Sequence, residues 1–208
     1  MPLVRVTNFS ISLDGFGAGE PQSLESPFGH AGERLHEWML ATWQDGAPFG
    51  VDLVFAQRWD VGFGAEIMGA NKFGPPGWQD DPAWRGWWGE DPPFHTPTYV
   101  LTHRPRESME MAGGTTFHFL DASPEEALAV AKQAAGDLDV RIGGGSSTLR
   151  DFLAAGLVDH LHLVLVPIVL GRGTRLWDGL EALEETYAVE ATPSSSGVVH
   201  LSMTRKHG

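Results

Sequence analysis

Three consecutive glycines, Gly143, Gly144 and Gly145, interrupt an apolar run at the point where a helix is expected to begin. The segment VRIGGGSSTLRDFLAAGL predicts a strand through Ile142, then the glycines, then a helix with serine N-caps and Gly156 at its end. Such a junction leaves unpaired backbone N–H groups at the positive end of the helix dipole, and glycine lets the main chain approach a flat ligand. The pattern predicts a site for a phosphate or a ring edge. A tight β-to-α turn with nothing bound is the alternative.

A second glycine, Gly69, ends the short buried strand at residues 65–68 in the sequence AEIMGANKFG. Open α/β folds bind ligands at the carboxyl edge of the sheet, so we expect one ligand to span both glycine loops. Neither loop matches the dinucleotide fingerprint GxGxxG, and the chain has no GxxxxGK[ST] phosphate loop. These absences argue against a standard Rossmann domain and a P-loop enzyme.

Asp14, which ends the first predicted strand and precedes Gly15, is the candidate acid or base for catalysis. Asp-Gly is also a common turn, so a purely structural role is the alternative. His160 and His162 would share one face of a strand, but a pair of histidines does not complete a zinc site and no HExxH occurs, so we expect no metal. The chain has no cysteine and no GxSxG elbow, which excludes a cysteine nucleophile and argues against serine hydrolysis.

Strands alternate with helices through much of the chain. We predict strands at residues 3–13, 65–69, 98–102, 115–120, 138–142, 160–171, 185–192 and 197–205, and helices at residues 33–43, 51–59, 124–135 and 148–155. The third helix carries a capping box, with Ser123 as N-cap and Glu126 three residues later, and Gly136 ends it. The alternation favours parallel connections, and the last strands, which have no helix between them, favour an antiparallel end to the sheet.

The segment at residues 73–97 contains four tryptophans and six prolines, too many prolines for a regular element. A loop of this length in a compact domain is more often a lid or a packed insertion than a linker. Three interpretations stay open: an aromatic cover over the core, a dimer contact, and a lid over the substrate.

The composition is that of an ordinary globular protein, with 42% hydrophobic and 20% charged residues. The length of 208 residues and the absence of a composition break predict a single domain over residues 1–208. No stretch approaches the roughly 18 apolar residues of a membrane span, and no signal peptide is recognisable, so we expect a cytoplasmic protein with no membrane partner. The net charge of −13 argues against a nucleic-acid partner.

Five stretches together resemble the dihydrofolate-reductase-like superfamily. They occur in the order and spacing of that family and read SISLDGF, IMGANKF, VLTHRP, RIGGGSST and DHLHLVLVPIVLGRGTRLW. More narrowly, nearly the whole chain is similar to stand-alone bacterial proteins that resemble the C-terminal reductase domain of the bifunctional riboflavin-biosynthesis deaminase/reductase. The resemblance implies a three-layer α/β/α fold. Its central sheet would be mostly parallel, with antiparallel C-terminal strands.

The resemblance also implies a cofactor site for NADPH. It would place Gly69, Ala70, Asn71 and Lys72 at the adenosine ribose and pyrophosphate, and Thr102, His103 and Arg104 beside the adenosine 2′-phosphate. The pyrophosphate and nicotinamide side would be carried by Ile142, Gly143, Gly144, Gly145, Ser146, Ser147 and Thr148. In the family the first glycine pair of this loop is joined by a cis peptide, which the resemblance places at Gly143-Gly144.

The chain departs from the family in three ways. The usual arginine after the first-loop glycine is replaced by Ala70, so NADH is a second candidate cofactor. The zinc deaminase signature of the bifunctional enzymes is absent, which excludes deamination. Glu33 and Glu37 lie near the position of the folate-binding carboxylate, but neither matches it, so a folate substrate does not follow.

The resemblance implies an NAD(P)H-dependent oxidoreductase of the dihydrofolate reductase or 5-amino-6-(5-phosphoribosylamino)uracil reductase type. Its substrate would be a small heterocyclic or sugar-derived molecule of pterin or pyrimidine type, and Asp14 is the candidate contact for proton transfer. We also expect a homodimer. The alternative is a non-catalytic nucleotide-binding protein with the same fold.

Overall fold

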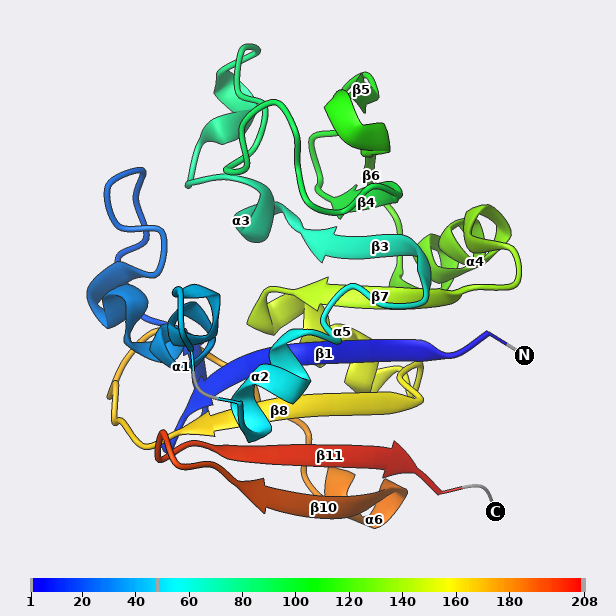
Figure 1. Cartoon of the computed structure of the whole chain (residues 1–208). Helices are drawn as coiled ribbons and strands as arrows, with labels where there is room; N and C mark the ends of the chain where they lie inside the picture. Colours follow the sequence, from blue (N-terminus) through cyan, green and yellow to red (C-terminus); the bar gives the residue numbers. More distant parts are fainter. Residues whose placement is uncertain (1, 48, 207–208) are drawn as a thin grey trace.

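The computed structural model describes residues 2–47 and 49–206, and a nine-stranded sheet forms its centre (Figure 1). The strands are β1 (Val4–Ser12), β2 (Phe16–Ala18), β3 (Phe63–Gly69), β4 (Pro97–Leu101), β5 (Met109–Glu110), β6 (Thr116–Leu120), β7 (Asp139–Gly144), β8 (His160–Val166), β9 (Thr174–Arg175), β10 (Tyr187–Pro193) and β11 (Val199–Arg205). The α-helices are α1 (Glu37–Leu40), α2 (Val51–Ala56), α3 (Ala70–Phe73), α4 (Pro124–Ala135), α5 (Ser146–Ala154) and α6 (Leu183–Thr186). The 3-10 turns are η1 (Gly29–Leu35), η2 (Ala41–Trp43), η3 (Trp78–Asp80) and η4 (Ala112–Gly114).

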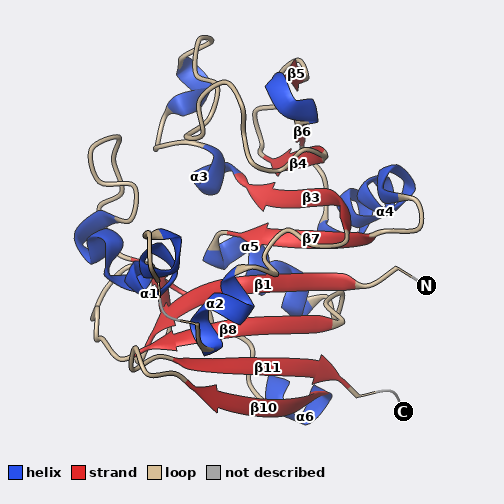
Figure 2. Cartoon of the chain, viewed as in Figure 1, coloured by secondary structure: helices blue, strands red, loops and turns tan. Residues whose placement is uncertain are grey.

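The strand order is β10-β11-β8-β1-β7-β3-β4-β6-β5. The six central strands from β8 to β6 pair in parallel, whereas β10, β11 and β5 add antiparallel edges. Helices cover both faces, with α1 and α2 in front of the sheet and α5 behind it in Figure 2. The expected α/β class, with a mostly parallel sheet and antiparallel C-terminal strands, is confirmed.

The predicted helix at residues 33–43 is wrong as one continuous element. The chain instead forms three short turns, η1, α1 and η2, and none of them has a side-chain N-cap. Turns this short are not stable alone. Burial of Leu35 and Trp38 against the sheet holds them in place.

The first strand changes the face that it buries part of the way along. Val4 and Val6 are buried in its first half and Ile11 in its second, and the pairing with β8 shifts register between Val6 and Phe9. Asn8 has a φ of +54° at this bulge, and its backbone N–H donates to Nδ1 of His162. A strict alternation over residues 3–13 therefore does not describe the strand.

Other predicted elements differ mainly at their ends. The capping box at Ser123 is confirmed, because its hydroxyl accepts from the Glu126 N–H while the Glu126 side chain accepts from the Ser123 N–H. The strand predicted at residues 160–171 ends at Val166, since Pro167 has no N–H to donate. The helix predicted at residues 51–59 ends at Ala56.

The tryptophan-rich segment packs onto the sheet. Trp78 is 3% exposed and lies against Phe73 and Phe119. Its indole N–H donates to the Ala70 carbonyl, and the indole N–H of Trp84 donates to the Phe73 carbonyl. The segment is thus an aromatic cover over this part of the core, which is the first of the three interpretations given for residues 73–97. No helix in the described part of the chain is long and apolar enough to cross a membrane.

Candidate functional site

The two glycine loops lie side by side. Strands β3 and β7 pair in parallel, with Met68 opposite Gly144, so both end at the same edge of the sheet. A β-carbon on Gly69 would overlap the hydroxyl of Thr148 in the first turn of α5. The tertiary structure therefore brings together the strand ends that the sequence predicted would share one ligand.

The first turn of α5 carries no side-chain cap. Its N-cap is Gly145, which corrects the prediction that Ser146 and Ser147 cap this helix. The helix begins two residues earlier than predicted because Ser146 is already helical and is buried against Gly17 of β2. Apart from Gly145 and its own neighbours along the chain, no atom of the described residues lies within 4 Å of where a Gly145 β-carbon would sit, so a ligand can approach the main chain there.

The cis peptide is found one residue later than the resemblance placed it. It joins Gly144 to Gly145, and the bond between Gly143 and Gly144 is not cis. The reason is that β7 continues through Gly144, so the junction between strand and helix falls after the second glycine. Gly144 has a φ of +103°, which only glycine adopts readily, and Phe9 covers it.

Residues 102–104 follow β4, the strand next to β3, at the same edge of the sheet. The backbone N–H of Thr102 donates to the Leu120 carbonyl, and the Thr102 hydroxyl accepts from the backbone N–H of Arg104. The side chain of His103 is 99% exposed, and the guanidinium of Arg104 pairs with Asp80 at 2.6 Å. The cation expected beside the 2′-phosphate thus already has a carboxylate partner.

The residues after Gly69 form the short helix α3. Asn71 is exposed, and Ala70 packs partly against the aromatic cluster beneath the tryptophan-rich segment. The Lys72 ammonium donates to Oε1 of Glu66 at 2.9 Å. Lys72, like Arg104, therefore already has a carboxylate partner within the protein.

A buried charge cluster consists of Glu66, Arg141 and Lys72, and sequence reasoning missed its two strand residues. Glu66 on β3 is 1% exposed and Arg141 on β7 is 4% exposed. The guanidinium of Arg141 donates to Oε2 of Glu66 through two nitrogens and to the Trp59 carbonyl through the third. Glu66 is the one charge in AEIMG, and Arg141 stands between apolar residues in VRI, and that pattern was the available signal.

Burial and charge alter the ionisation of this cluster. Burial raises the pKa of Glu66, but the charges of Arg141 and Lys72 outweigh it, so the pKa is lowered. Burial also lowers the pKa of Lys72, and the Glu66 carboxylate opposes that shift only in part. Burial and the nearby charge of Lys72 lower the pKa of His36 to about 4, so His36 is neutral at pH 7.

Asp14 is held in a network of hydrogen bonds. Its carboxylate accepts from the Ser12 hydroxyl at 2.6 Å and from the backbone N–H groups of Leu170 and Gly171 at 3.1 and 2.7 Å. Burial opposes ionisation, but these hydrogen bonds together lower the pKa of Asp14 to about 2. The carboxylate carries no proton at neutral pH and ties β1 to the loop after β8.

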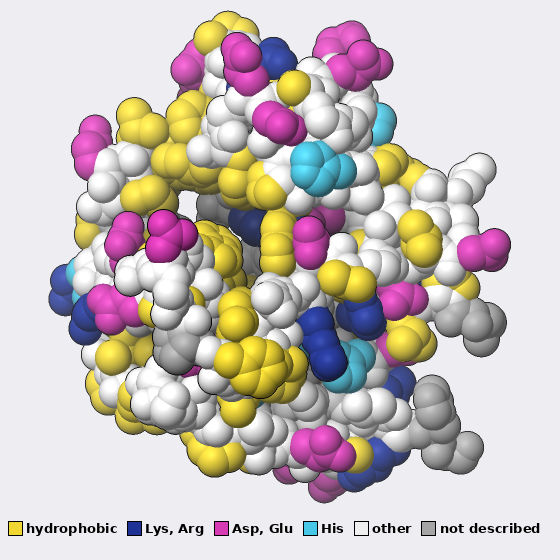
Figure 3. Space-filling view, in the orientation of Figure 1, with side chains coloured by type: hydrophobic (Ala, Val, Ile, Leu, Met, Phe, Trp, Pro, Cys, Tyr) yellow, Lys and Arg dark blue, Asp and Glu magenta, His cyan; other side chains and the backbone are white. Residues whose placement is uncertain are grey.

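A hollow opens in the face of the molecule that carries α1 (Figure 3). It lies between α1 and the tryptophan-rich segment, residues 73–97. Hydrophobic side chains surround it, and Lys or Arg atoms are visible at its bottom. Two aromatic rings border the charge cluster: Trp59, which follows α2, lies 4.4 Å from the Arg141 guanidinium, and Phe94 of the tryptophan-rich segment lies 5.6 Å from Nζ of Lys72.

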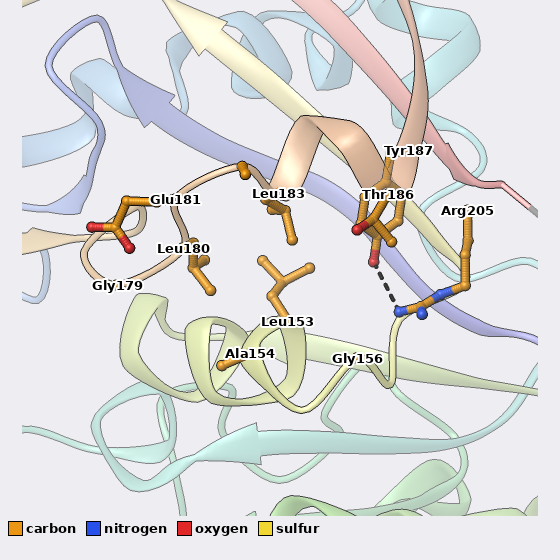
Figure 4. A pocket seen from close by; sticks show the side chains of 11 residues that line it. Leu153, Ala154, Gly156, Gly179, Leu180, Glu181, Leu183, Thr186, Tyr187 and Arg205 are labelled. Carbon is orange, nitrogen blue, oxygen red and sulfur yellow. Dashed lines mark hydrogen bonds between the residues drawn. The ribbon is translucent and has the colours of Figure 1, made fainter.

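A separate pocket lies at the C-terminal end of α5, away from the glycine loops (Figure 4). Leu153, Leu180 and Leu183 line it, and Arg205 donates to the Tyr187 hydroxyl at its side. None of the predicted site residues contributes to it, so it forms no part of the candidate site.

Within residues 2–47 and 49–206, no group of three or more His, Cys, Asp or Glu side chains could hold a metal ion. His162 instead contacts His200, with 3.1 Å between Nε2 and Nδ1, and His200 contacts Asp52 at 2.8 Å.

Glu33 and Glu37, the carboxylates that lie near the folate-binding position of the family, are both exposed.

Comparison with known proteins agrees with the fold. The family model of the RibD C-terminal domain matches residues 4–200. Similar solved structures include a candidate riboflavin biosynthesis protein from Shewanella sp. PV-4, at 20% identity and a TM-score of 0.61, with all of both chains covered. A pyrimidine reductase-like protein from Corynebacterium diphtheriae matches at 14% identity and a TM-score of 0.54, with 100% of this chain and 93% of that one covered.

A third structure is the bifunctional diaminohydroxyphosphoribosylaminopyrimidine deaminase/5-amino-6-(5-phosphoribosylamino)uracil reductase from Thermotoga maritima. It matches at 14% identity and a TM-score of 0.56, and the match covers 99% of this chain but only 57% of that one. No curated protein sequence matches the chain significantly.

Proposed function

The chain belongs to the RibD C-terminal domain family, and from this membership we propose that it is a nicotinamide-dependent reductase. Its substrate would be a small heterocyclic or sugar-derived molecule of the riboflavin-pathway type, and the pyrimidine reductase-like neighbours support this substrate class. A reduced nicotinamide would supply the hydride, while the protein orients the reactants and excludes water.

The observation that carries the proposal is the meeting of the two glycine loops at one sheet edge. Gly69, Gly145 and Thr148 lie together there, with the uncapped first turn of α5 beside them. Backbone N–H groups at the positive end of a helix suit a pyrophosphate, and the open space at Gly145 suits a flat ring. These residues fit a nicotinamide dinucleotide. Ile142, Gly143, Gly144, Ser146 and Ser147 complete the proposed loop.

The choice between NADPH and NADH depends on the cations near Thr102. Arg104 is paired with Asp80, Ala70 carries no charge, and Lys72 is turned to Glu66. With no unpaired guanidinium among these residues, we expect NADH to bind within about tenfold of NADPH, a difference of about 1.4 kcal/mol.

Titration of the purified protein with each cofactor tests the proposal. Quenching of tryptophan fluorescence and a thermal shift are expected with both cofactors. Asp80→Ala frees Arg104, so this variant is expected to shift the preference toward NADPH. Absence of any response to either cofactor at millimolar concentration would reject the reductase assignment.

A non-catalytic nucleotide-binding protein is the second candidate. It is favoured by Ala70 and by the hydrogen bonds of Asp14, which leave this carboxylate no proton to donate at neutral pH. Saturable cofactor binding without cofactor oxidation across pterins, flavin precursors and quinones would support it over the enzyme.

A further inference from the structure

The cluster of Glu66, Arg141 and Lys72 contains two cations and one carboxylate. Glu66 uses both oxygens, one for each cation, and Arg141 directs its remaining guanidinium nitrogen to the Trp59 carbonyl. An ammonium has three N–H donors, and in the described chain the Lys72 ammonium has one hydrogen-bond partner, Glu66. The cluster carries an excess positive charge, and its spare donors are those of Lys72.

The Lys72 ammonium lies beside the glycine loop. A β-carbon on Gly143 would sit 2.6 Å from Nζ of Lys72 and would overlap Oε1 of Glu66, so this glycine leaves the space that the ion pair occupies. The Lys72 side chain is 28% exposed, whereas those of Glu66 and Arg141 are 2% and 5% exposed. Of the three side chains, only that of Lys72 is accessible enough for a ligand to contact.

The surroundings of Lys72 suit a polar group on a flat molecule. The Phe94 ring lies 5.6 Å from Nζ, and the Trp59 ring covers Arg141 at 4.4 Å. The charge of Lys72 also acts on His36, a neutral imidazole whose buried Nδ1 has no hydrogen-bond partner in the described part of the chain. Buried polar atoms without partners are uncommon, and a bound ligand is one way in which they are satisfied.

We propose that Lys72 contacts the substrate rather than the cofactor, and that its ammonium binds the reducible C=O or C=N group and supplies the proton. This inference rests on the proposed reductase function. In the step, the substrate carbon gains a hydride from the reduced nicotinamide, and its oxygen or nitrogen gains a proton from Nζ. The substrate double bond becomes a single bond, the nicotinamide is oxidised, and the Lys72 amine regains its proton from water.

Glu66 is then a positioning residue, because it fixes the ammonium without contacting the substrate. Arg141 holds the carboxylate ionised. The lowered pKa of Lys72 favours proton release at a pH closer to neutral than an exposed lysine allows.

Competitive acetylation resolved by mass spectrometry tests the contact directly, because the chain has only three lysines, Lys72, Lys132 and Lys206. The acetylation rate of each lysine is measured without ligand and then with one added ligand: NADH, NADPH, 5-amino-6-(5-phosphoribosylamino)uracil or inorganic phosphate. Lys132, exposed on α4, is the internal reference. We expect the pyrimidine to slow acetylation of Lys72 about tenfold at ten times its Kd, with Lys132 unchanged.

The outcomes separate this inference from the reductase assignment. Protection of Lys72 by NADPH or NADH alone would place it at the cofactor, and equal protection by phosphate would make it a simple anion site. Either result overturns the inference, as does no protection by the pyrimidine. Protection by the pyrimidine without cofactor binding would keep the contact and reject the reductase.

Variants add a second readout. Lys72→Met is expected to bind both cofactors as the wild type does and to lose at least about tenfold in pyrimidine affinity, with Lys132→Met as the matched control. Gly143→Ala places a methyl group against the ion pair of Glu66 and Lys72. We expect this variant to change the acetylation rate of Lys72 although the lysine itself is not substituted. A lower cofactor affinity in Lys72→Met, with an unchanged melting temperature, would contradict the assignment.

Discussion

The carboxylate of Asp14 is of a type that can act as a catalytic acid or base, but its surroundings engage it in hydrogen bonds. Three donors converge on it, two of them backbone N–H groups of the loop after β8. A carboxylate held in this way stabilises the fold while it is ionised. Its role as a contact for proton transfer stays a prediction, and its hydrogen bonds favour a positioning role.

Asp14→Asn is expected to lower the free energy of unfolding by about 1–3 kcal/mol at pH 7, because an amide presents fewer acceptors to three donors. The pKa of Asp14 is about 2 in the folded protein and ordinarily near 3.8, so its stabilisation is present above about pH 4 and disappears toward pH 2.

Urea unfolding of Asp14→Asn and wild type from pH 7 to pH 2 checks this. The difference between the two proteins should shrink as the pH falls through that range. A constant difference at all pH values would show that ionisation of Asp14 does not contribute.

Among the elements, the contact between the end of β3 and the first turn of α5 determines the geometry of the site. Gly69 has a φ of −82°, which any residue adopts, so the requirement for glycine here is steric rather than conformational. Thr148 occupies the space that a side chain at Gly69 would need.

Gly69→Ala is therefore expected to destabilise the protein by about 1–3 kcal/mol and to weaken cofactor binding, because the β-carbon separates the two loops. Thr148→Ala removes the overlapping hydroxyl and should rescue much of the loss in the double variant. A double-mutant cycle of urea unfolding measures this coupling. Strictly additive effects would mean that the two residues do not oppose each other.

At the scale of the whole molecule, buried histidines make stability depend on pH. His162 is 3% exposed and His200 is fully buried, and they join β8 and β11 to Asp52 of α2. Burial, followed by the charges of His200 and His160, lowers the pKa of His162 to about 3. The unfolded chain takes up this proton near pH 6.5, whereas the folded protein does not.

Stability is therefore expected to fall as the pH drops from about 6.5 toward 3, by up to about 1.4 kcal/mol per pH unit for His162 alone. Chemical unfolding of wild type, His162→Leu and the exposed control His103→Asn between pH 7 and pH 4 measures the slope. The slope should become shallower only in His162→Leu. Parallel profiles for all three proteins would contradict the buried neutral imidazole.

The homodimer stays a prediction. The packed tryptophan-rich segment changes how it should be tested, because deleting residues 78–88 would remove Trp78 from the core and expose Phe73. Light scattering of the intact chain measures the assembly without that damage.

Elements whose signals are local could be predicted from the sequence. The strand patterns, the capping box of α4 and the family motifs predicted the α/β class and the antiparallel end of the sheet, since each depends on neighbouring residues. The same reasoning failed at residues 33–43 and at Ser146, where packing against the sheet and β2 decided the outcome. Local propensity is too weak to resist such contacts.

Which candidate residues share a site depends on contacts between distant parts of the chain, and these are visible in the fold alone. Glu66 and Arg141 are 75 residues apart in the chain, and β3 and β7 place them directly opposite each other. That pairing gives Lys72 a carboxylate partner and places its ammonium beside Gly143. The physical reason is that a buried carboxylate must be compensated by whatever cations the fold brings within reach, and sequence spacing does not encode that distance.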